Sequence, residues 1–390
     1  MHQTDRFMPL RIAIFSPMIL GVGKTVETYS SQQISLAKAW VAQGHHVDVI
    51  TSRSDGLEEY LVQRGIGAYI VPALWTLRRP RSPMFLLGGW RKLLFGAYDV
   101  IFCSEHYQPT TALACLLSSE VVVYQGQNTP GSTLFSRFVF RLLDHTCGRI
   151  VRKRYRWMIT KTHAAKDYAL ERDFVRQSVV PCGVDTERFS TLSVEEKQNA
   201  RLSFGLDNSA VVWIYAGNLI PRRGLDTALR AFALFSMENP NAFFFIIGDG
   251  DDEPRLEILA KSLGIKERIS FVGALNWWDL KRYYGVSDIF VFPTQYEIYG
   301  LVLLEAIASG LKIITTGCPA AVDLAAQWPH IINFFEVGDY KGLCDQAKKV
   351  SSGWHRYETI NTEIIDEISW ENIAKKILNE MPSSPHKQII

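Results

Sequence analysis

The chain has 390 residues, 47% of them hydrophobic, which is too long for one compact core and indicates two domains of similar size. Its six cysteines include no C-x-x-C pair and no metal-ligand spacing, which argues against a disulfide framework and against a zinc site. The net charge of +2 hides an asymmetry, because residues 1–190 carry 23 Lys+Arg against 15 Asp+Glu whereas residues 191–390 carry 19 against 25.

Nothing in the sequence indicates export or a membrane span. The first residues contain no basic segment followed by a long apolar stretch and a small-residue cleavage site. No later run reaches the roughly 18 apolar residues that a spanning helix needs. We therefore expect a cytoplasmic protein with reduced thiols, either free in solution or attached peripherally to the cytoplasmic face of a membrane.

A glycine-containing loop follows the first apolar run, at residues 11–15. Its Gly23, Lys24 and Thr25 match the last three letters of an ATP-binding P-loop, which needs a further glycine five positions before Gly23. Met18 stands there instead. Two interpretations remain open at this point: a P-loop ATPase, and an ordinary turn between a strand and a helix.

Short β-rich runs alternate with helix-length amphipathic segments along almost the whole chain. In the first half the runs lie at 11–15, 46–50, 68–71, 99–103, 121–124, 157–160 and 178–181, and in the second half at 211–215, 242–247, 269–272, 289–293, 312–316 and 331–335. Continuous apolar strands separated by helices predict parallel sheets covered on both faces, hence doubly wound α/β domains.

Two stretches, 74–96 and 135–157, concentrate basic residues among large apolar ones. They are consistent with ordinary amphipathic helices that have a solvated face, and equally with a surface that contacts anionic lipid head groups. No nucleic-acid motif accompanies the charge, so no nucleic-acid partner is expected. For the lipid alternative, the expected contacts in the first stretch are Arg78, Arg79, Arg81, Arg91 and Lys92.

The domain boundary is expected near residue 190, because a polar helical stretch follows it and a new strand starts at Val211. The predicted organisation is a first domain at 1–190, a second at 191–368, a helix at 369–381 that crosses back to the first, and a tail at 382–390. Parallel sheets bind ligands at the carboxyl ends of their strands, so the chemistry is expected there.

The stretch 290–310, FVFPTQYEIYGLVLLEAIASG, carries the strongest functional signal. A buried strand ends, a short loop follows, and a helix is expected to begin near Tyr299. Free N–H groups at Tyr299, Gly300 and Leu301 can hold a diphosphate. Glu297 and Glu305 flank that site, and because carboxylates repel phosphate, their expected targets are ribose and sugar hydroxyl groups.

A second strand end contributes positive charge to the same domain. After the run 211–215 comes a loop with Arg222 and Arg223, and Gly224 then opens an amphipathic helix. A guanidinium at the carboxyl end of a strand can clamp two diphosphate oxygens. The stretch 242–273 supplies another strand, a glycine turn and a helix, which can bring more backbone groups to a nucleotide.

Four motifs in this order resemble those of the retaining GT-B glycosyltransferases, specifically glycosyltransferase family 4. EIYGLVLLEA is similar to the family's E-x-F-G-x-x-x-x-E-A, GNLIPRRG to G-R-L-x-x-x-K-G, IIGDGDDEPRLE to G-x-G-x-x-x-x-L, and VPCGVDTERF to P-N-G-V-D-x-x-x-F. The resemblance implies two Rossmann-like domains facing across a cleft, with the donor bound by the second domain and the acceptor by the first.

The same resemblance implies roles for individual residues. Glu305 would hold the nucleotide ribose, Glu297 the transferred sugar and Arg223 the diphosphate, and Glu297, Arg223 and His106 are the catalytic candidates. The expected donor contacts are Gly217, Asn218, Arg222, Arg223, Gly248, Glu297, Tyr299, Gly300, Leu301 and Glu305. The loop expected to face the donor phosphates and the acceptor contributes Gly21, Gly23 and Lys24, joined by Gln125 from another strand end.

Two positions depart from the family pattern. Asn218 replaces the arginine that normally assists the family's lysine, whose position is taken by Arg223, so half of the usual cationic clamp is missing. Gln125 stands where many relatives have a histidine that contacts the reacting sugar, and His106, at the end of another strand, is the second candidate for that contact.

The resulting hypothesis is a retaining glycosyltransferase that moves a sugar from a nucleotide-sugar donor to a hydroxyl of a glycan or lipid-linked acceptor. It needs no metal or other cofactor, because helix N–H groups and Arg223 can stabilise the departing diphosphate. A noncatalytic GT-B scaffold that binds a nucleotide sugar is the alternative from another class, and the P-loop ATPase is the more distant one.

Overall fold

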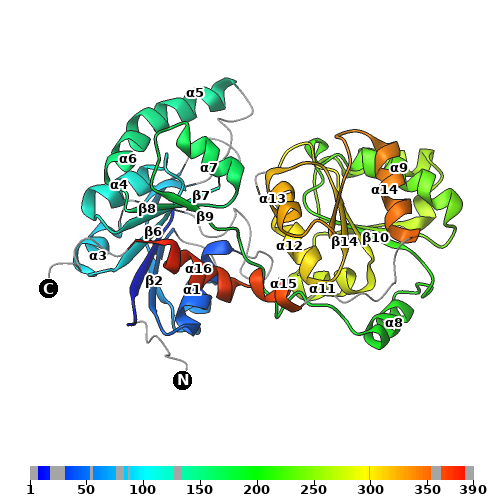
Figure 1. Ribbon diagram of the computed structural model, residues 1–390, viewed down its shortest axis with the longest axis horizontal. Coiled ribbons are helices and arrows are strands. Elements are labelled where there is room, and N and C mark those ends of the chain that lie inside the picture. The colour runs from blue at the N-terminus through cyan, green and yellow to red at the C-terminus, as the bar shows by residue number, and fades with distance from the viewer. Residues whose placement is uncertain are drawn as a thin grey trace. The chain divides into compact units, whose positions relative to one another are not determined.

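The computed structural model describes residues 8–17, 31–52, 56–75, 83–86, 88–126, 134–297, 299–352 and 362–382. The chain divides into two compact units (Figure 1). The first contains residues 1–182 and 370–390, and the second contains residues 183–369. Each unit is described by itself below.

A parallel seven-stranded sheet forms the centre of the first unit, with the strand order β3-β2-β1-β6-β7-β8-β9. All the runs predicted as strands in the first half of the chain are in this sheet. The strands are β1 (Arg11–Phe15), β2 (His46–Thr51), β3 (Gly67–Ile70), β6 (Val100–Ser104), β7 (Val121–Gln125), β8 (Trp157–Thr160) and β9 (Gln177–Val179). Between β3 and β6 the structure adds an antiparallel pair that the sequence pattern did not predict, β4 (Ala73–Trp75) and β5 (Pro83–Leu86).

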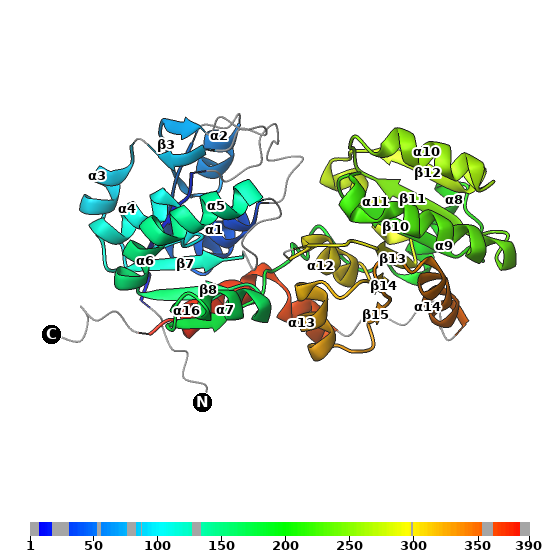
Figure 2. The same ribbon diagram turned by 90° about the horizontal axis from the view of Figure 1, so that it is seen from above.

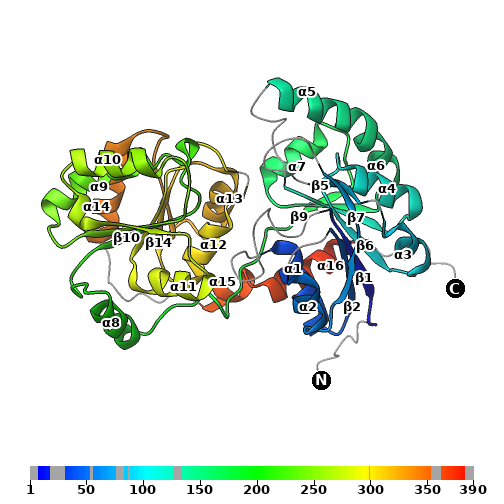
Figure 3. The same cartoon turned by 180° about the vertical axis from the view of Figure 1, so that it is seen from behind.

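Helices cover both faces of this sheet (Figures 1 and 3). They are α1 (Gln32–Ala42), α2 (Leu57–Val62), α3 (Trp90–Phe95), α4 (Pro109–Leu117), α5 (Leu134–Leu143), α6 (Arg149–Arg154), α7 (His163–Leu170) and α16 (Trp370–Glu380). A π-helical turn, η1 (Asp144–Gly148), joins α5 directly to α6. The predicted basic stretch 135–157 is therefore mostly one continuous helical segment.

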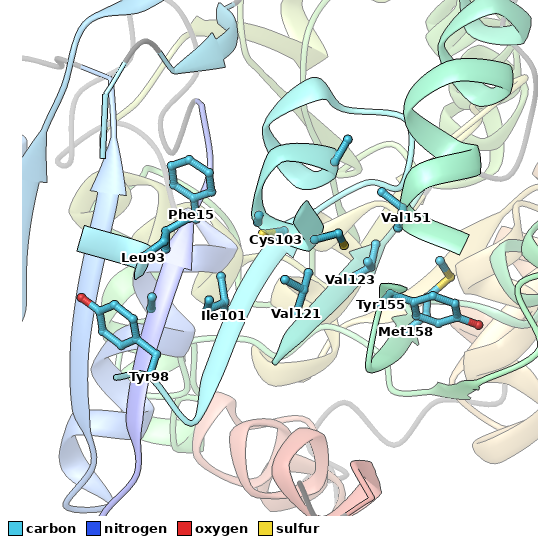
Figure 4. Close-up of a cluster of buried hydrophobic side chains, with 14 of the residues drawn as sticks. Phe15, Leu93, Tyr98, Ile101, Cys103, Val121, Val123, Val151, Tyr155 and Met158 are labelled. Carbon is cyan, nitrogen blue, oxygen red and sulfur yellow. The ribbon is translucent and has the colours of Figure 1, made fainter. Parts of the chain in front are cut away.

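The core of the first unit lies between its sheet and the helices α3, α4 and α6 (Figure 4). Apolar side chains of β1, β6 and β7 point to this layer, where Leu93 of α3 and Val151 of α6 are almost completely buried. On α1, the indole N–H of Trp40 donates to the carbonyl oxygen of Ala374 at 3.2 Å, and the Gln43 amide donates to that of Glu371 at 2.8 Å. These bonds join α16, from the end of the chain, to the first unit.

A parallel six-stranded sheet forms the second unit, with the order β12-β11-β10-β13-β14-β15, and it contains all the strands predicted for the second half. Its strands are β10 (Val212–Ala216), β11 (Phe243–Ile247), β12 (Ile269–Gly273), β13 (Ile289–Phe292), β14 (Lys312–Thr315) and β15 (Ile332–Phe334). Two parallel, helix-covered sheets confirm the predicted doubly wound α/β class.

The helices of the second unit also lie on both faces of its sheet (Figure 2). They are α8 (Val194–Ser203), α9 (Leu225–Glu238), α10 (Glu253–Ser262), α11 (Trp277–Val286), α12 (Leu301–Ala308), α13 (Pro319–Gln327), α14 (Tyr340–Ser352) and α15 (Thr362–Glu367), with 3₁₀ turns η2 (Pro221–Arg223) and η3 (Lys266–Arg268). None of the helices in the described parts of either unit is long and apolar enough to cross a bilayer.

A buried ion pair fixes α8 to the amino end of β13. Asp288, 1% exposed, accepts from the guanidinium of Arg201 at 2.6 Å and lies 3.0 Å from the ammonium of Lys197. The same carboxylate accepts from the main-chain N–H of Val212, the first residue of β10. This carboxylate therefore ties the first helix of the unit to the two central strands whose opposite ends carry the candidate site.

We expect Asp288→Ala to lower the free energy of unfolding by about 3–5 kcal/mol, because it leaves the buried guanidinium of Arg201 without its counter-charge. Glu238→Ala is the control, since the Glu238–Lys348 pair is exposed to solvent, which screens it, and its loss should change the free energy of unfolding far less. Urea unfolding followed by tryptophan fluorescence measures both variants. Equal losses in the two variants would contradict the anchoring role of Asp288.

Candidate functional site

The strand order of the second unit places a topological switch point between β10 and β13. From β10 the chain continues to β11 and β12 on one side, and β13, β14 and β15 occupy the other side. In open α/β sheets, ligands bind outside the carboxyl ends of the strands at such a point. The loops concerned are 217–224 after β10 and 293–300 after β13, which contain most of the donor residues predicted from the sequence.

Glycines let the loops at these strand ends approach one another closely. Gly248, with φ of +131°, follows β11, and a Cβ atom there would lie only 1.9 Å from the carbonyl oxygen of Gly217. Gly224 has φ of +66°, and its Cβ would lie 2.1 Å from the carbonyl oxygen of Pro293. Larger residues would push these loops apart, so the glycines bring the ends of β10, β11 and β13 together.

An ion pair joins the two loops at the switch point. The guanidinium of Arg223 donates directly to the carboxylate of Glu297, and the two side chains are only 12% and 16% exposed. The guanidinium also lies over the ring of Phe292, 5.4 Å from its centre. The buried Nε of Arg223 has no hydrogen-bond acceptor within the described part of the chain.

Arg222, the neighbouring arginine, has a different position. Its guanidinium donates to the carbonyl oxygen of Tyr296 at 2.8 Å, and its own carbonyl accepts from the main-chain N–H of Gln295 at 2.8 Å. Arg222 therefore connects the two loops while its side chain remains exposed.

Asn218 lies earlier in the loop after β10. Its main-chain carbonyl accepts a hydrogen bond from the hydroxyl of Tyr215 at 2.9 Å.

The helix predicted to begin near Tyr299 begins two residues later, at Leu301. Gly300 is its N-cap and has φ of +70°, a left-handed conformation that cannot continue into a right-handed helix. The main-chain N–H of Tyr299 donates to Glu297 at 3.4 Å, and a Cβ on Gly300 would lie 3.2 Å from the Cγ of Glu297. The start of α12 and the Glu297 carboxylate are therefore direct neighbours.

Glu305 lies on the second turn of α12 and is partly buried. Tyr284 of α11 donates its hydroxyl to the Glu305 carboxylate at 3.2 Å. Burial raises the pKa of Glu305 to about 7, and the Tyr284 hydrogen bond and the charge of Arg188 oppose this shift. Arg188 is held in turn by Asp185 at 2.9 Å and lies over the ring of Trp277 at 4.5 Å.

The predicted residues of the first unit turn inward. His106 is 1% exposed and Gln125 is fully buried. The His106 ring lies 2.9 Å from the Gln125 amide oxygen and 3.1 Å from Asp144. Neither side chain is available to a substrate in this conformation. The predicted loop residues Gly21, Gly23 and Lys24 lie outside the described residues.

A cluster of aspartates, Asp249, Asp251 and Asp252, follows β11. Asp252 is 6% exposed and its two carboxylate oxygens accept from the guanidinium of Arg255 at 2.6 and 2.8 Å. Within the described ranges, the structure brings together no group of three or more His, Cys, Asp or Glu residues able to hold a metal ion.

Comparison with known families assigns both halves of the chain. Residues 32–188 match the model described as Glycosyltransferase Family 4, and residues 196–363 match Glycosyl transferases group 1. The chain belongs to glycosyltransferase family 4. The assignment selects the transferase over the noncatalytic scaffold and the P-loop ATPase that the sequence left open.

Similar proteins extend this glycosyltransferase assignment along the chain. An uncharacterized glycosyltransferase of Methanocaldococcus jannaschii is 27% identical over 366 residues, which cover 88% of this chain and 91% of the relative. The alpha-monoglucosyldiacylglycerol synthase of Acholeplasma laidlawii is 26% identical, over 78% of this chain and 80% of the relative.

Solved structures confirm the GT-B fold. HepE of Anabaena, in complex with UDP, superposes with a TM-score of 0.71 at 15% identity, over 95% of this chain and 99% of that one. The lipopolysaccharide-synthesis glycosyltransferase WaaG superposes with a TM-score of 0.59 at 17% identity, over 95% of both chains. The fold predicted from the motifs is therefore the one that the glycosyltransferase adopts.

In the ligand-free glycosyltransferase, Glu305→Gln should change how stability depends on pH. Because the pKa of Glu305 is raised from 4.5 to about 7, the folded state keeps a proton that the unfolded state loses, so the contribution of Glu305 to stability is lost as pH rises through this window. Glutamine does not titrate. Relative to that of the wild type, the free energy of unfolding of the variant should rise by about 1–2 kcal/mol between pH 5 and pH 8, allowing for the partial exposure of the carboxylate.

Urea unfolding at these two pH values measures the effect. Glu257→Gln, at an exposed position of α10, is the matched control and should follow the wild type. A Glu305→Gln profile parallel to that of the wild type would show that Glu305 titrates normally.

Proposed function

We propose that the second unit binds the nucleoside diphosphate of a sugar donor at the switch point between β10 and β13, and that the sugar passes to an acceptor hydroxyl with retention of configuration. The observation that carries the proposal is the Arg223–Glu297 ion pair, which lies between the ends of these two strands and beside the start of α12. This arrangement puts a cation, a carboxylate and helix N–H groups within one small region.

Arg223 is the proposed diphosphate ligand. The partly exposed guanidinium would donate to a phosphate oxygen while one of its nitrogens remains bound to Glu297. The amino end of α12 adds the partial positive charge of a helix terminus. Glu297, which repels phosphate, is then directed to the sugar hydroxyls, and Arg222 supports the loop from outside the site.

Glu305 is the proposed ligand of the ribose. A carboxylate can accept hydrogen bonds from two neighbouring hydroxyls, and Tyr284 fixes one of its oxygens from the protein side. Because burial raises its pKa to about 7, binding of ribose hydroxyls should favour the charged form and release a proton near neutral pH.

The reaction needs no protein nucleophile. The acceptor oxygen bonds to the anomeric carbon on the face that the diphosphate leaves, the carbon–oxygen bond to the diphosphate breaks, and the leaving phosphate oxygen takes the acceptor's proton. The developing negative charge is stabilised by Arg223 and the start of α12. We propose that these groups suffice without a divalent metal or another cofactor.

The acceptor is proposed to be a glycan or a lipid-linked molecule bound by the basic first unit. Among the relatives, the Acholeplasma protein is named for a glucosyldiacylglycerol product and a Corynebacterium glutamicum protein for a phosphatidylinositol monomannoside. For this chain we propose a cytoplasmic location with peripheral contact to an anionic membrane.

Helix α5 is the best-described candidate for that contact. Its exposed face combines Phe138, 65% exposed, and Leu142, 53% exposed, with the exposed Arg137 and Arg141. Arg91 of α3 is exposed as well. Lys92 is less suited than its sequence indicated, because its ammonium donates to the Tyr69 hydroxyl at 2.6 Å and lies 3.8 Å from Asp48. Arg78, Arg79 and Arg81 lie outside the described residues.

A thermal-shift screen against UDP-, GDP- and ADP-sugars should identify the donor, because a ligand that binds only the folded state raises its stability. For the nucleotide so identified, Glu305→Gln and Arg223→Ala should each weaken binding by about 1–3 kcal/mol, since each removes a charged hydrogen-bond partner. Calorimetric titration measures the dissociation constants, with Arg230→Ala on the exposed side of α9 as the matched control.

Unchanged dissociation constants in both site variants would show that the donor does not bind at the switch point. Lys24→Ala serves as a further comparison. If Lys24→Ala weakened nucleotide binding more than Arg223→Ala, the P-loop interpretation of the loop after the first strand would be favoured again.

Turnover should continue in EDTA, and an α-linked donor should yield an α-linked product. NMR of the newly formed glycoside reads its configuration before hydrolysis or mutarotation. A β-linked product from that donor, or activity lost in EDTA and restored by magnesium or manganese, would overturn the proposed chemistry.

Vesicles with anionic lipids should bind the protein at low salt. Replacing Arg91, Arg137 and Arg141 together by Gln should abolish this binding, since each basic residue contributes roughly 1 kcal/mol near such a surface. Salt should weaken the binding of the wild type, because it screens these charges. The matched control replaces three exposed lysines of the second unit, Lys261, Lys266 and Lys349, by Gln. Cosedimentation that is absent at low salt, or equal in the two triple variants, would contradict the membrane contact.

A further inference from the structure

A partly buried lysine lies at the carboxyl edge of the first sheet, in the unit proposed to bind the acceptor. Lys161 directly follows β8, and its main-chain N–H donates to the carbonyl oxygen of Gln125, the last residue of β7, at 3.0 Å. Its side chain is only partly exposed. Within the described ranges, no carboxylate forms a salt bridge with its ammonium. Lysine is rarely withdrawn from water without a partner of opposite charge.

An aromatic ring holds the ammonium in place. Nζ of Lys161 lies over the ring of Tyr124, 4.4 Å from its centre. Tyr124 is fully buried in β7, and its hydroxyl lies 3.1 Å from the sulfur of Cys182. Burial raises the pKa of the Cys182 thiol to about 11, and the charge of Lys161 opposes this shift, which agrees with an ammonium close by. The ring attracts the cation but carries no net charge, so the ammonium is not neutralised.

A glycine makes room for the lysine side chain. Gly126 follows β7, and a Cβ atom there would lie 2.9 Å from Nζ of Lys161 and 3.1 Å from its Cδ. The lysine side chain therefore lies across the main chain of the glycine. A larger residue at position 126 would displace the ammonium from the Tyr124 ring.

The neighbouring strand ends set the charge around Lys161. On the β6 side, the carboxylate of Glu105 accepts from the main-chain N–H of Gly126 at 3.1 Å. On the β8 side, α7 begins at His163 with Thr162 as its N-cap, and no acidic residue lies in the first turn. The amino end of a helix carries partial positive charge. The end of β8 therefore combines an ammonium with a helix terminus, and the acid lies beyond Gly126.

We propose that Lys161 binds a phosphate group of the acceptor at the carboxyl ends of β7 and β8. The proposal rests on the proposed function in one respect, namely that the first unit binds the acceptor. Ligands reach parallel sheets at this edge. An ammonium that has lost part of its water is stabilised by ligand oxygens that replace that water.

Phosphate fits this lysine better than a carboxylate does. An ammonium has three donors and acts as a compact point charge, which suits phosphate, whereas planar carboxylates are matched by the fork of an arginine. A phosphate monoester carries about two negative charges near neutral pH. The phosphate can belong to a lipid head group or to a soluble polyol or sugar phosphate, and its contact with Lys161 is the same in both.

Titration of the full-length protein with glycerol 3-phosphate tests the site, with the main-chain amide NMR signals of Gly126 and Lys161 as the measurement. Both signals should shift in the wild type, and glycerol, which lacks the phosphate, should leave them unchanged. Lys161→Gln should weaken binding by about tenfold or more, because charged hydrogen bonds are lost. Lys161→Arg should retain most of the affinity. Lys153→Gln, at an exposed lysine of α6, is the matched control and should bind as the wild type does.

Gly126→Ala provides a second test that keeps the charge. Its added Cβ displaces the ammonium, so glycerol 3-phosphate should bind more weakly although Lys161 is present. Affinity equal to that of the wild type in both Lys161→Gln and Gly126→Ala would overturn the proposal. A wild-type protein whose Gly126 and Lys161 signals do not respond to the phosphate would overturn it as well.

Dihexanoyl phosphatidic acid, used below its micellar concentration, distinguishes the two sources of phosphate. Binding tighter than that of glycerol 3-phosphate assigns the site to a lipid head group, and equal binding assigns it to a soluble acceptor. Nucleotide titration separates this proposal from the donor site, because Lys161→Gln should bind the nucleotide as the wild type does. A loss of nucleotide affinity in Lys161→Gln would assign the lysine to the donor and overturn the proposal. Failure of nucleotide binding at Arg223 and Glu305 would contradict the donor site alone.

Discussion

The ion pair between Arg223 and Glu297 is the contact on which the candidate site of the second unit depends. Each side chain is nearly buried, so neither charge is stable without the other. Their pairing requires the loops after β10 and β13 to meet, and Gly224 allows this approach. At the opposite end of the same strands, Asp288 joins β10, β13 and α8. An ion pair therefore stabilises each end of the strand pair β10 and β13.

The strands of both sheets could be predicted from the sequence because buried parallel strands form continuous apolar runs of a recognisable length. The hairpin β4–β5 was missed because its short strands lie at the start of the basic stretch 74–96 and within it, and this stretch was read as an amphipathic segment. The start of α12 was placed two residues early, because sequence periodicity does not show that Gly300 is left-handed.

Some residues of the candidate site could likewise be predicted from the sequence and others could not. Glu297, Glu305 and Arg223 could be named from motifs that stand at strand ends. Tyr284 could not, because it belongs to another helix, 21 residues before Glu305, and only the fold brings them to 3.2 Å. His106 and Gln125 were correctly placed at strand ends, but pattern alone does not tell whether a side chain at the last position of a strand points to solvent or to the interior.

The two units thus use buried polar groups for different purposes. In the second unit, the Arg223 guanidinium stays partly exposed while it pairs with Glu297, which fits a ligand-binding role. In the first unit, the ring nitrogens of His106 lie within hydrogen-bonding distance of Gln125 and Asp144, which fits a structural role. Satisfied networks rigidify a structure, whereas a partly exposed charged group remains accessible to a ligand.

The most direct test of the donor site is a crystal structure of the protein with the nucleoside diphosphate that stabilises it most. The account predicts diphosphate oxygens within hydrogen-bonding distance of the Arg223 guanidinium and of the N–H groups at the start of α12, with the ribose hydroxyls on Glu305. A diphosphate bound elsewhere, with the Arg223–Glu297 pair and the Glu305–Tyr284 hydrogen bond unchanged and free of ligand, would contradict it.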